Sequence, residues 1–221
     1  MTQSPFKPAG IIFDFDGVVV DSLEVHLTAW KSAYQELYHC ELSDTFGLPG
    51  RSTGAIATIL STRAGRPSTI EALATLKKRH LSEAMPLIKP FPGVLDSFSY
   101  LSSHGIPFGI ASNAPRAFIL KSLEAIGATV EIIFGVDDVS RPKPAPDIFL
   151  ACARALKIPF QQHPTTIVFE DSLHGLAAAV AAGMYPVGIE TQHNEYDLVD
   201  AGAKRTFKDI AHAKANGIFA I

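Results

Sequence analysis

Two aspartates stand one residue apart where an apolar run ends near the start of the chain. The segment reads IIFDFDG, and Asp14 and Asp16 follow directly after residues 11–13. A short β-branched and aromatic run indicates a buried parallel strand, and open α/β folds bind ligands beyond the carboxyl ends of such strands. Residues two apart in an extended chain point to the same side, so the two carboxylates can converge. This pair suits a hard metal ion with oxygen ligands, although an acidic turn closed by Gly17 is the alternative.

Three later segments place polar side chains where predicted strands end or where prolines restrict the backbone. In chain order they hold Ser112 with Asn113, Lys143 between two prolines, and Glu170 with Asp171. The hydroxyl of Ser112 and the amide of Asn113 suit either binding of an anion or capping of a helix. Lys143 is either held in one direction by the flanking prolines or exposed to solvent. The acidic pair suits Mg²⁺ or the start of a helix. Each segment alone stays ambiguous, and only their joint order favours one site.

Composition excludes several classes of protein. The chain has 221 residues, is 47% hydrophobic and 19% charged, and carries a net charge of −3, as expected for a globular protein. Its one local basic cluster, residues 77–79, predicts a solvated helix face or a contact to a substrate phosphate, and no nucleic-acid partner is expected. Cys40 and Cys152 lie far apart, and neither an export leader nor a membrane-spanning run is recognisable. We therefore expect a cytoplasmic protein without a membrane partner.

Hydrophobic periodicity divides the chain into a helical block and an alternating region. Helical spacing predicts helices over residues 23–38, 53–64, 69–85 and 94–103. Beyond these, strands at 107–112, 131–135, 165–170 and 185–190 alternate with helices at 118–126, 147–156 and 173–182, followed by a polar-to-helical section. This order predicts an α/β fold with a doubly wound parallel sheet. Its core comprises residues 1–22 and 89–221, and a helical domain of residues 23–88, able to close on a substrate, is inserted after the aspartate pair.

The four motifs together resemble those of the haloacid dehalogenase-like superfamily of phosphohydrolases. They read DFDGVVVDS, IASN, RPKPAPD and FEDSLHGLAAAVAAG, in the order of that superfamily. The resemblance covers essentially the whole chain. It implies a Rossmann-like core with a helical cap, Mg²⁺ as cofactor and a small phosphorylated metabolite as substrate.

The resemblance also implies roles for single residues. Asp14 is expected to be the nucleophile that forms an aspartyl-phosphate, and Asp16 the general acid and base. Ser112 and Lys143, with Asn113, are expected to hold the phosphoryl oxygens.

Metal binding is implied in the same way. The expected ligands of Mg²⁺ are Asp14, the main-chain carbonyl of Asp16, Glu170 and Asp171. Carbon–halogen hydrolysis is the competing chemistry of the superfamily, but dehalogenases resemble one another in lacking the second aspartate and the metal site. Phosphoryl transfer is therefore the favoured reaction.

The segments DSLEVHLTAWK and FEDSLHG are similar to those of β-phosphoglucomutases and related sugar-phosphate phosphatases. In that branch His26 is expected near Asp16, or at the domain hinge with structural contacts only. Mutases carry a cap arginine after the specificity loop, whereas here the loop GLPGRST places Thr53 at that position. This difference favours a phosphatase over a mutase. The expected substrate-binding residues of the cap are His26, Arg51, Lys78 and Arg79.

Two hypotheses from other classes remain open. A phosphoacceptor signalling domain also combines strand-end acids with Mg²⁺ and a lysine, but it would be shorter and would not need the helical insertion. A catalytically silent binding protein would be expected to have lost a catalytic group, and every motif residue is present. We therefore expect an Mg²⁺-dependent phosphomonoester hydrolase for a sugar phosphate or phosphoglycolate-like substrate, with a phosphosugar mutase as the alternative.

Overall fold

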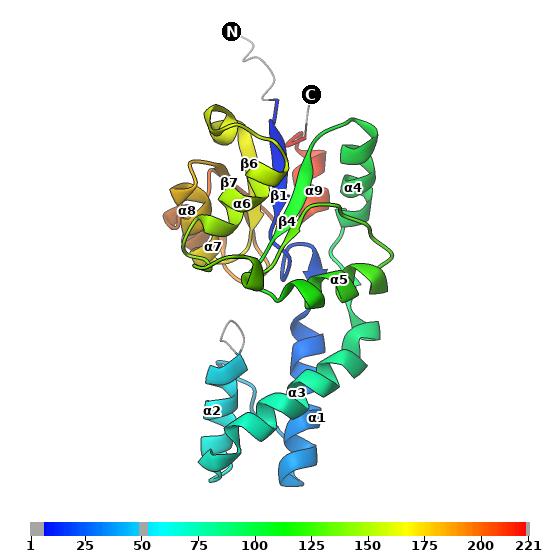
Figure 1. The fold of residues 1–221 in the computed structure, drawn as a ribbon, viewed down its shortest axis with the longest axis vertical. Coiled ribbons are helices and arrows are strands. Elements are labelled where there is room, and N and C mark those ends of the chain that lie inside the picture. Colours follow the sequence, from blue (N-terminus) through cyan, green and yellow to red (C-terminus); the bar gives the residue numbers. More distant parts are fainter. Residues whose placement is uncertain (1–6, 49–52, 220–221) are drawn as a thin grey trace. The chain divides into compact units, whose positions relative to one another are not determined.

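The computed structural model describes residues 7–48 and 53–219 of the chain. The chain separates into two compact units, coloured along the sequence in Figure 1. The larger unit comprises Met1–Asp21 and Lys89–Ile221, and the smaller one comprises Ser22–Ile88. The motif residues of the sheet ends all belong to the larger unit.

The larger unit is built on a six-stranded sheet in which every neighbouring pair is parallel (Figure 1). The strand order is β5-β4-β1-β6-β7-β8. The strands are β1 (Gly10–Phe13), β4 (Phe108–Ala111), β5 (Ile133–Phe134), β6 (Thr166–Glu170), β7 (Tyr185–Ile189) and β8 (Arg205–Phe207). The predicted α/β class with a parallel sheet is confirmed.

Helices connect these strands. They are α4 (Val94–Ser103), α5 (Arg116–Ala125), α6 (Asp147–Ala155), α7 (Leu173–Ala181), α8 (Glu195–Asp200) and α9 (Ile210–Ala215), with short 3₁₀ turns at Val136–Asp138 and Phe160–Thr165. A two-stranded antiparallel ribbon of β2 (Val20–Asp21) and β3 (Lys89–Pro90) belongs to the same unit. None of the helices in the described part of the chain is long and apolar enough to cross a membrane.

Strand β1 is apolar throughout because both faces of the sheet are covered. On one face Ile12 belongs to a buried cluster with Phe149 of α6 and residues of α7. On the other face the ring of Phe13 lies 5.3 Å, between centroids, from both Phe98 of α4 and Phe169 of β6. Burying one such side chain stabilises the fold by about 1.5–3 kcal/mol, so β1 is anchored firmly at the centre of the sheet.

The register of the sheet brings the predicted motifs to the same level. Phe13 lies opposite Ile110 of β4 and opposite Phe169 of β6. The chain therefore leaves the three strands just beyond these residues, at one edge. Strand order also reverses at β1, and such a switch point is where open α/β sheets form binding crevices.

The smaller unit consists of α1 (Leu23–Tyr38), α2 (Thr53–Arg63) and α3 (Ile70–Ala84), with 3₁₀ turns at Pro67–Thr69 and Met85–Leu87. Its three helices share an apolar core of their own, which includes Trp30, Leu60 and Leu73. Arg51, one of the expected substrate-binding residues, lies outside the described residues.

Several predicted elements differ in detail from the structure, and the strand predicted over residues 131–135 is reduced to Ile133–Phe134. Helix α5 begins at Arg116 and not at residue 118, because Pro115 in an extended conformation forms its N-cap. The polar-to-helical section at the end of the chain contains the unexpected strand β8. That strand has three residues and an exposed Arg205, so it carries no clear pattern, and its pairing with β7 defines it.

Candidate active site

Three carboxylates gather where β1 and β6 end. Asp14, Glu170 and Asp171 each present an oxygen such that all three atoms lie within 4.8 Å of one another. All three side chains are buried. The first motif and the last one, which are more than 150 residues apart, thus form one cluster, as expected from their positions after parallel strands.

Lys143 supplies positive charge to this cluster. Its Nζ lies 2.5 Å from Asp14 Oδ1 and 2.5 Å from Glu170 Oε1, and 4.6 Å from the ring centre of Phe149. Burial lowers the pKa of this ammonium, but the two carboxylates outweigh burial and raise the pKa to about 12. Lys143 is therefore a fixed cation, not a solvated one.

The carboxylates are not fully neutralised by that lysine. Burial, followed by repulsion from Glu170, raises the pKa of Asp14 well above its usual value. The same two causes raise the pKa of Asp171 to about 7. Three buried carboxylates facing one ammonium leave a deficit of positive charge, and their oxygen atoms are the donors that Mg²⁺ prefers. The donor set therefore fits a divalent cation.

Glu170 is held by three donors. Its Oε2 accepts bonds from the main-chain N and the hydroxyl of Ser172, at 3.0 and 2.8 Å, and its Oε1 accepts from Lys143. Ser172 is also the N-cap of α7, where its Oγ accepts from the main-chain N of Gly175. A Cβ on Gly175 would lie 1.8 Å from Glu170 Oε1, so glycine is required for this carboxylate to occupy its place.

Ser112 and Asn113 follow β4, but their side chains have different environments. Ser112 is buried, and its Oγ accepts a bond from the main-chain N of Ala114 at 3.2 Å. The amide of Asn113 forms two bonds to the main chain of Lys143: Oδ1 accepts from its N at 3.0 Å and Nδ2 donates to its O at 3.2 Å. The structure thus uses the Asn113 side chain to hold the lysine loop, and binding of phosphate at this position stays a prediction.

Asp16 lies in the turn that follows β1. It is partly buried and forms an isolated bridge with Val20, while the main-chain N of Gly17 donates to Val20 O at 2.9 Å. The residue is therefore two positions from Asp14 on a tightly bonded turn. Its expected role as acid and base stays a prediction.

Thr191 is a polar residue of this edge that the motif analysis missed. It lies two residues beyond β7, and its Oγ1 is 2.7 Å from Gly17 O and 3.0 Å from Asp171 Oδ2. No motif marks it. Its signal is positional: like Asp14, Ser112 and Asp171, it lies within two residues of the carboxyl end of a parallel strand.

In the smaller unit, the basic cluster of residues 77–79 is not one solvated face, which corrects the sequence-based expectation. Lys77 is 5% exposed, and its Nζ lies 3.0 Å from Nδ1 of His26 and 5.6 Å from the ring centre of Trp30. It occupies the same side of α3 as the buried Leu73, four residues earlier. Because an ammonium only donates, Nδ1 accepts, and burial followed by Lys77 lowers the pKa of His26 to about 4.

The other two predicted basic residues of the cap face outward. Lys78 is exposed, and the guanidinium of Arg79 is also exposed and pairs with Glu36 of α1. Binding of substrate by His26, Lys78 and Arg79 stays a prediction.

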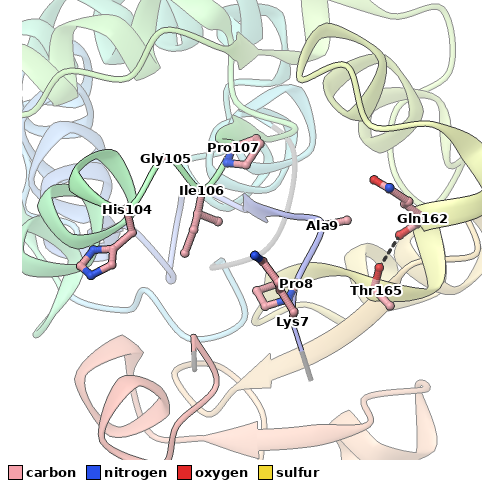
Figure 2. A pocket seen from close by; sticks show the side chains of 9 residues that line it. All are labelled: Lys7, Pro8, Ala9, His104, Gly105, Ile106, Pro107, Gln162 and Thr165. Atoms are coloured by element: carbon pink, nitrogen blue, oxygen red, sulfur yellow. Dashed lines mark hydrogen bonds between the residues drawn. The ribbon is translucent and has the colours of Figure 1, made fainter. Parts of the chain in front are cut away.

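A pocket of about 420 Å³ lies at the opposite edge of the sheet (Figure 2). Its lining comes from the segments that precede β1, β4 and β6, among them Ala9, Pro107 and Thr165. The hydroxyl of Thr165 donates to Gln162 O at 3.0 Å, as the dashed line in Figure 2 shows. Among the described residues, the lining contains no carboxylate, so this part of the pocket lacks the chemistry found at the other edge.

Comparison with known proteins identifies relatives along most of the chain. The profile of the haloacid dehalogenase-like hydrolases matches residues 11–189. A validoxylamine A 7′-phosphate phosphatase of Streptomyces hygroscopicus is 29% identical over 86% of this chain and 89% of that protein. A fructose-1-phosphate phosphatase of Escherichia coli is 29% identical over 82% of this chain and 96% of that protein.

Two further comparisons concern length and fold. The chloroplastic protein SUPPRESSOR OF QUENCHING 1 of Arabidopsis thaliana is 29% identical over 96% of this chain, which spans only 21% of that longer protein. A crystal structure described as a β-phosphoglucomutase homologue of Thermotoga maritima superposes with a TM-score of 0.80, at 22% identity, over 95% of this chain and 96% of that one. The latter likeness concerns the fold alone.

Proposed function

This chain belongs to the haloacid dehalogenase-like hydrolase family, and from that membership we propose that it is an Mg²⁺-dependent phosphomonoester hydrolase for a small phosphorylated metabolite. The phosphatase activities that its relatives from Streptomyces hygroscopicus and Escherichia coli are named for support hydrolysis of a phosphate ester. The metal, the covalent mechanism and the substrate are the finer parts of the proposal. They rest on the geometry of the carboxylate cluster.

One observation carries the proposal: Lys143 Nζ bridges Asp14 Oδ1 and Glu170 Oε1, with Asp171 in the same cluster. A carboxylate that is fixed by an ammonium at a switch point of the sheet is suited to attack an electrophile that carries negative oxygens. Lys143 offsets the charge that develops on those oxygens, and it also favours the ionised form of Asp14. An ordinary acidic turn would need neither the burial nor the lysine.

In the proposed reaction, an oxygen of Asp14 attacks phosphorus and the bond from phosphorus to the ester oxygen breaks. The leaving oxygen keeps the electron pair and takes a proton from Asp16. In the second step Asp16 accepts a proton from water, whose oxygen attacks phosphorus and releases the carboxylate of Asp14 with inorganic phosphate. Ser112 and Lys143 hold the phosphoryl oxygens through both steps.

The residues proposed to hold Mg²⁺ are Asp14, Glu170, Asp171 and the main-chain carbonyl of Asp16. When bound there, the metal would supply the positive charge that the cluster lacks and so lower the repulsion between an anionic nucleophile and an anionic phosphate. The fit rests on the burial and the oxygen donors of the cluster.

A phosphorylated sugar or sugar-like compound is the proposed class of substrate. The support is that two relatives, each covered over more than four fifths of its length, bear the names of validoxylamine A 7′-phosphate and fructose-1-phosphate phosphatases. The likeness to a β-phosphoglucomutase homologue does not favour a mutase, because it shows only the fold. A cytoplasmic location, without membrane or nucleic-acid partners, is part of the proposal, and the free thiols of Cys40 and Cys152 support it.

The test is release of phosphate from a panel of sugar phosphates, phosphoglycolate and β-glucose-1-phosphate, with Mg²⁺ and with a chelator, while isomerised sugar phosphates are also followed. We expect release that requires Mg²⁺ and that Asp14→Asn abolishes without unfolding the protein. Asp200→Asn, at an exposed aspartate of α8, is the matched control and should retain the activity. Isomerisation without release would make the protein a mutase, and undiminished activity of Asp14→Asn would overturn the nucleophile.

A further inference from the structure

We propose that Thr191 is a positioning residue of the metal site, which holds the carboxylate of Asp171 in the orientation that binds the cation. This inference rests on the proposed function, because it presumes that Asp171 is a ligand of Mg²⁺. Thr191 follows β7, and none of the four motifs lies on that strand, so the inference adds a further segment to the site.

The hydroxyl of Thr191 connects three segments of the larger unit. It is 3.0 Å from Asp171 Oδ2, beyond β6, and 2.7 Å from the carbonyl oxygen of Gly17, in the turn beyond β1. Thr191 itself follows β7. The single hydroxyl proton of Thr191 is therefore shared between two acceptors in a three-centre hydrogen bond, and the turn that contains Asp16 is connected through Thr191 to the acidic pair.

Gly17 confines the same carboxylate from the other side. Its φ is +84°, and a Cβ built on it would lie 1.8 Å from Asp171 Oδ2 and 2.6 Å from Cγ. The carboxylate thus occupies the space that a side chain at position 17 would fill. Asp171 Oδ2 is enclosed between the glycine backbone and the threonine hydroxyl, which leaves it few alternative positions.

This carboxylate needs a donor more than an exposed one would. Asp171 is 1% exposed and adjacent to Glu170, so burial and repulsion both disfavour its charged form. The side chains of Thr191 and Gln192 both form hydrogen bonds to Asp171 and so stabilise its charged form. Groups that orient metal-binding carboxylates in this way typically change metal affinity by 10–100-fold when they are removed. The expected effect of losing the hydroxyl is thus on binding of the metal.

The experiment measures Mg²⁺ binding by isothermal titration calorimetry on the full chain, in the absence of substrate. Thr191→Val keeps the shape of the side chain and removes the hydroxyl, whereas Thr191→Ser keeps the hydroxyl. The matched control is Thr165→Val, which removes a threonine hydroxyl bonded to a carbonyl at the opposite edge of the sheet. The rise in unfolding temperature on adding Mg²⁺ is recorded for every variant as a second readout.

We expect Thr191→Val to weaken Mg²⁺ binding about tenfold or more and to reduce the rise in unfolding temperature, as removal of a metal-orienting group typically does. The Mg²⁺ affinity of Thr191→Ser should stay within about threefold of that of the unaltered protein, because serine keeps the hydroxyl. The Mg²⁺ affinity of Thr165→Val should equal that of the unaltered protein, because this variant keeps Thr191. In turnover assays, Thr191→Val should need about tenfold more Mg²⁺ while kcat at saturating Mg²⁺ changes little.

The possible results separate this inference from the function on which it rests. Unchanged affinity in Thr191→Val, or an equal loss in Thr191→Ser, would overturn the role of Thr191 and leave the proposed phosphatase intact. Absence of Mg²⁺ binding in the unaltered protein would overturn the metal site itself, and this inference with it. Should Thr191→Val not fold, Thr191→Ala and the serine variant provide the same comparison.

Discussion

Replacement of Gly175 by alanine tests whether the position of Glu170 is as tightly determined as the structure indicates. Gly175 is the third residue of α7, and its φ does not favour glycine. On helix propensity alone, alanine at this position should stabilise the protein by about 0.5–1 kcal/mol. The added Cβ, however, would lie 1.8 Å from Glu170 Oε1 and 1.9 Å from its Cδ, so the carboxylate must move.

Movement of Glu170 puts its bonds to Lys143 and Ser172 at risk. Breaking a buried ion pair costs about 3–5 kcal/mol, because the partner charge is left buried without compensation. After subtraction of the propensity gain, we expect a net loss of about 2–4 kcal/mol. For a chain of this size that corresponds to a fall in unfolding temperature of roughly 4–16 °C.

The assay is thermal and urea unfolding of Gly175→Ala beside Gly54→Ala. Gly54 is the second residue of α2, and among the described residues no atom other than those of its chain neighbours and its own helix backbone lies within 4 Å of a Cβ built on it, so alanine there should be neutral or stabilising. The two variants make the same change in helices and differ only in what the methyl group meets. Equal stability of the two variants would refute the reasoning. The reasoning would also fail if Gly175→Ala destabilised a protein that carries Glu170→Ala as much as it destabilises the unaltered protein.

Two further predictions concern charge and the lysine loop. Because the pKa of Asp171 rises from 3.8 to about 7 on folding, the folded state retains a proton that the unfolded state releases, so stability in chelator should fall between about pH 4 and 7. Asp171 contributes at most about 1.4 kcal/mol per pH unit to this slope, so urea unfolding of Asp171→Asn should show a smaller slope, with the part that is due to the raised pKa of Asp14 remaining. Separately, Asn113→Ala should lower kcat about tenfold by freeing the main chain of Lys143. Asn216→Ala removes an amide-to-carbonyl hydrogen bond on α9 and should leave kcat unchanged. Equal kcat values for the two variants would contradict the role of Asn113.

The sequence was sufficient for five of the six strands of the sheet and for the carboxylate cluster at its edge, because both follow from simple regularities. Apolar runs that alternate with helical spacing predict parallel strands, and parallel strands bring their carboxyl ends to one edge. The placement of Asp14, Glu170 and Asp171 in one buried cluster follows from that rule once the strands are located. The family resemblance, carried by the same residues, is confirmed.

What could not be predicted depends on contacts between segments that are distant in sequence. The two bonds from Asn113 to Lys143 span 30 residues, and nothing in IASN distinguishes a side chain that binds an anion from one that holds a loop. Lys77 was missed because a run of three basic residues indicates a surface, whereas the helix turns one of them toward Trp30 and His26. Thr191 was missed because its acceptors, Gly17 O and Asp171 Oδ2, become its neighbours only in the folded sheet.

The electrostatics of Asp14 show why these residues cannot be interpreted one at a time. Burial and then Glu170 raise its pKa, and a protonated aspartate is a poor nucleophile, so the aspartate alone does not account for reactivity. Lys143 opposes that shift through its charge and its hydrogen bond, and Glu170, while it repels Asp14, also holds Lys143 in place. A divalent cation among the same oxygens would favour the ionised form further. The proposed nucleophilicity of Asp14 is therefore a property of the whole cluster, and under this proposal a chain that kept the DFD segment but lost Lys143 or Asp171 would keep the motif without its chemistry.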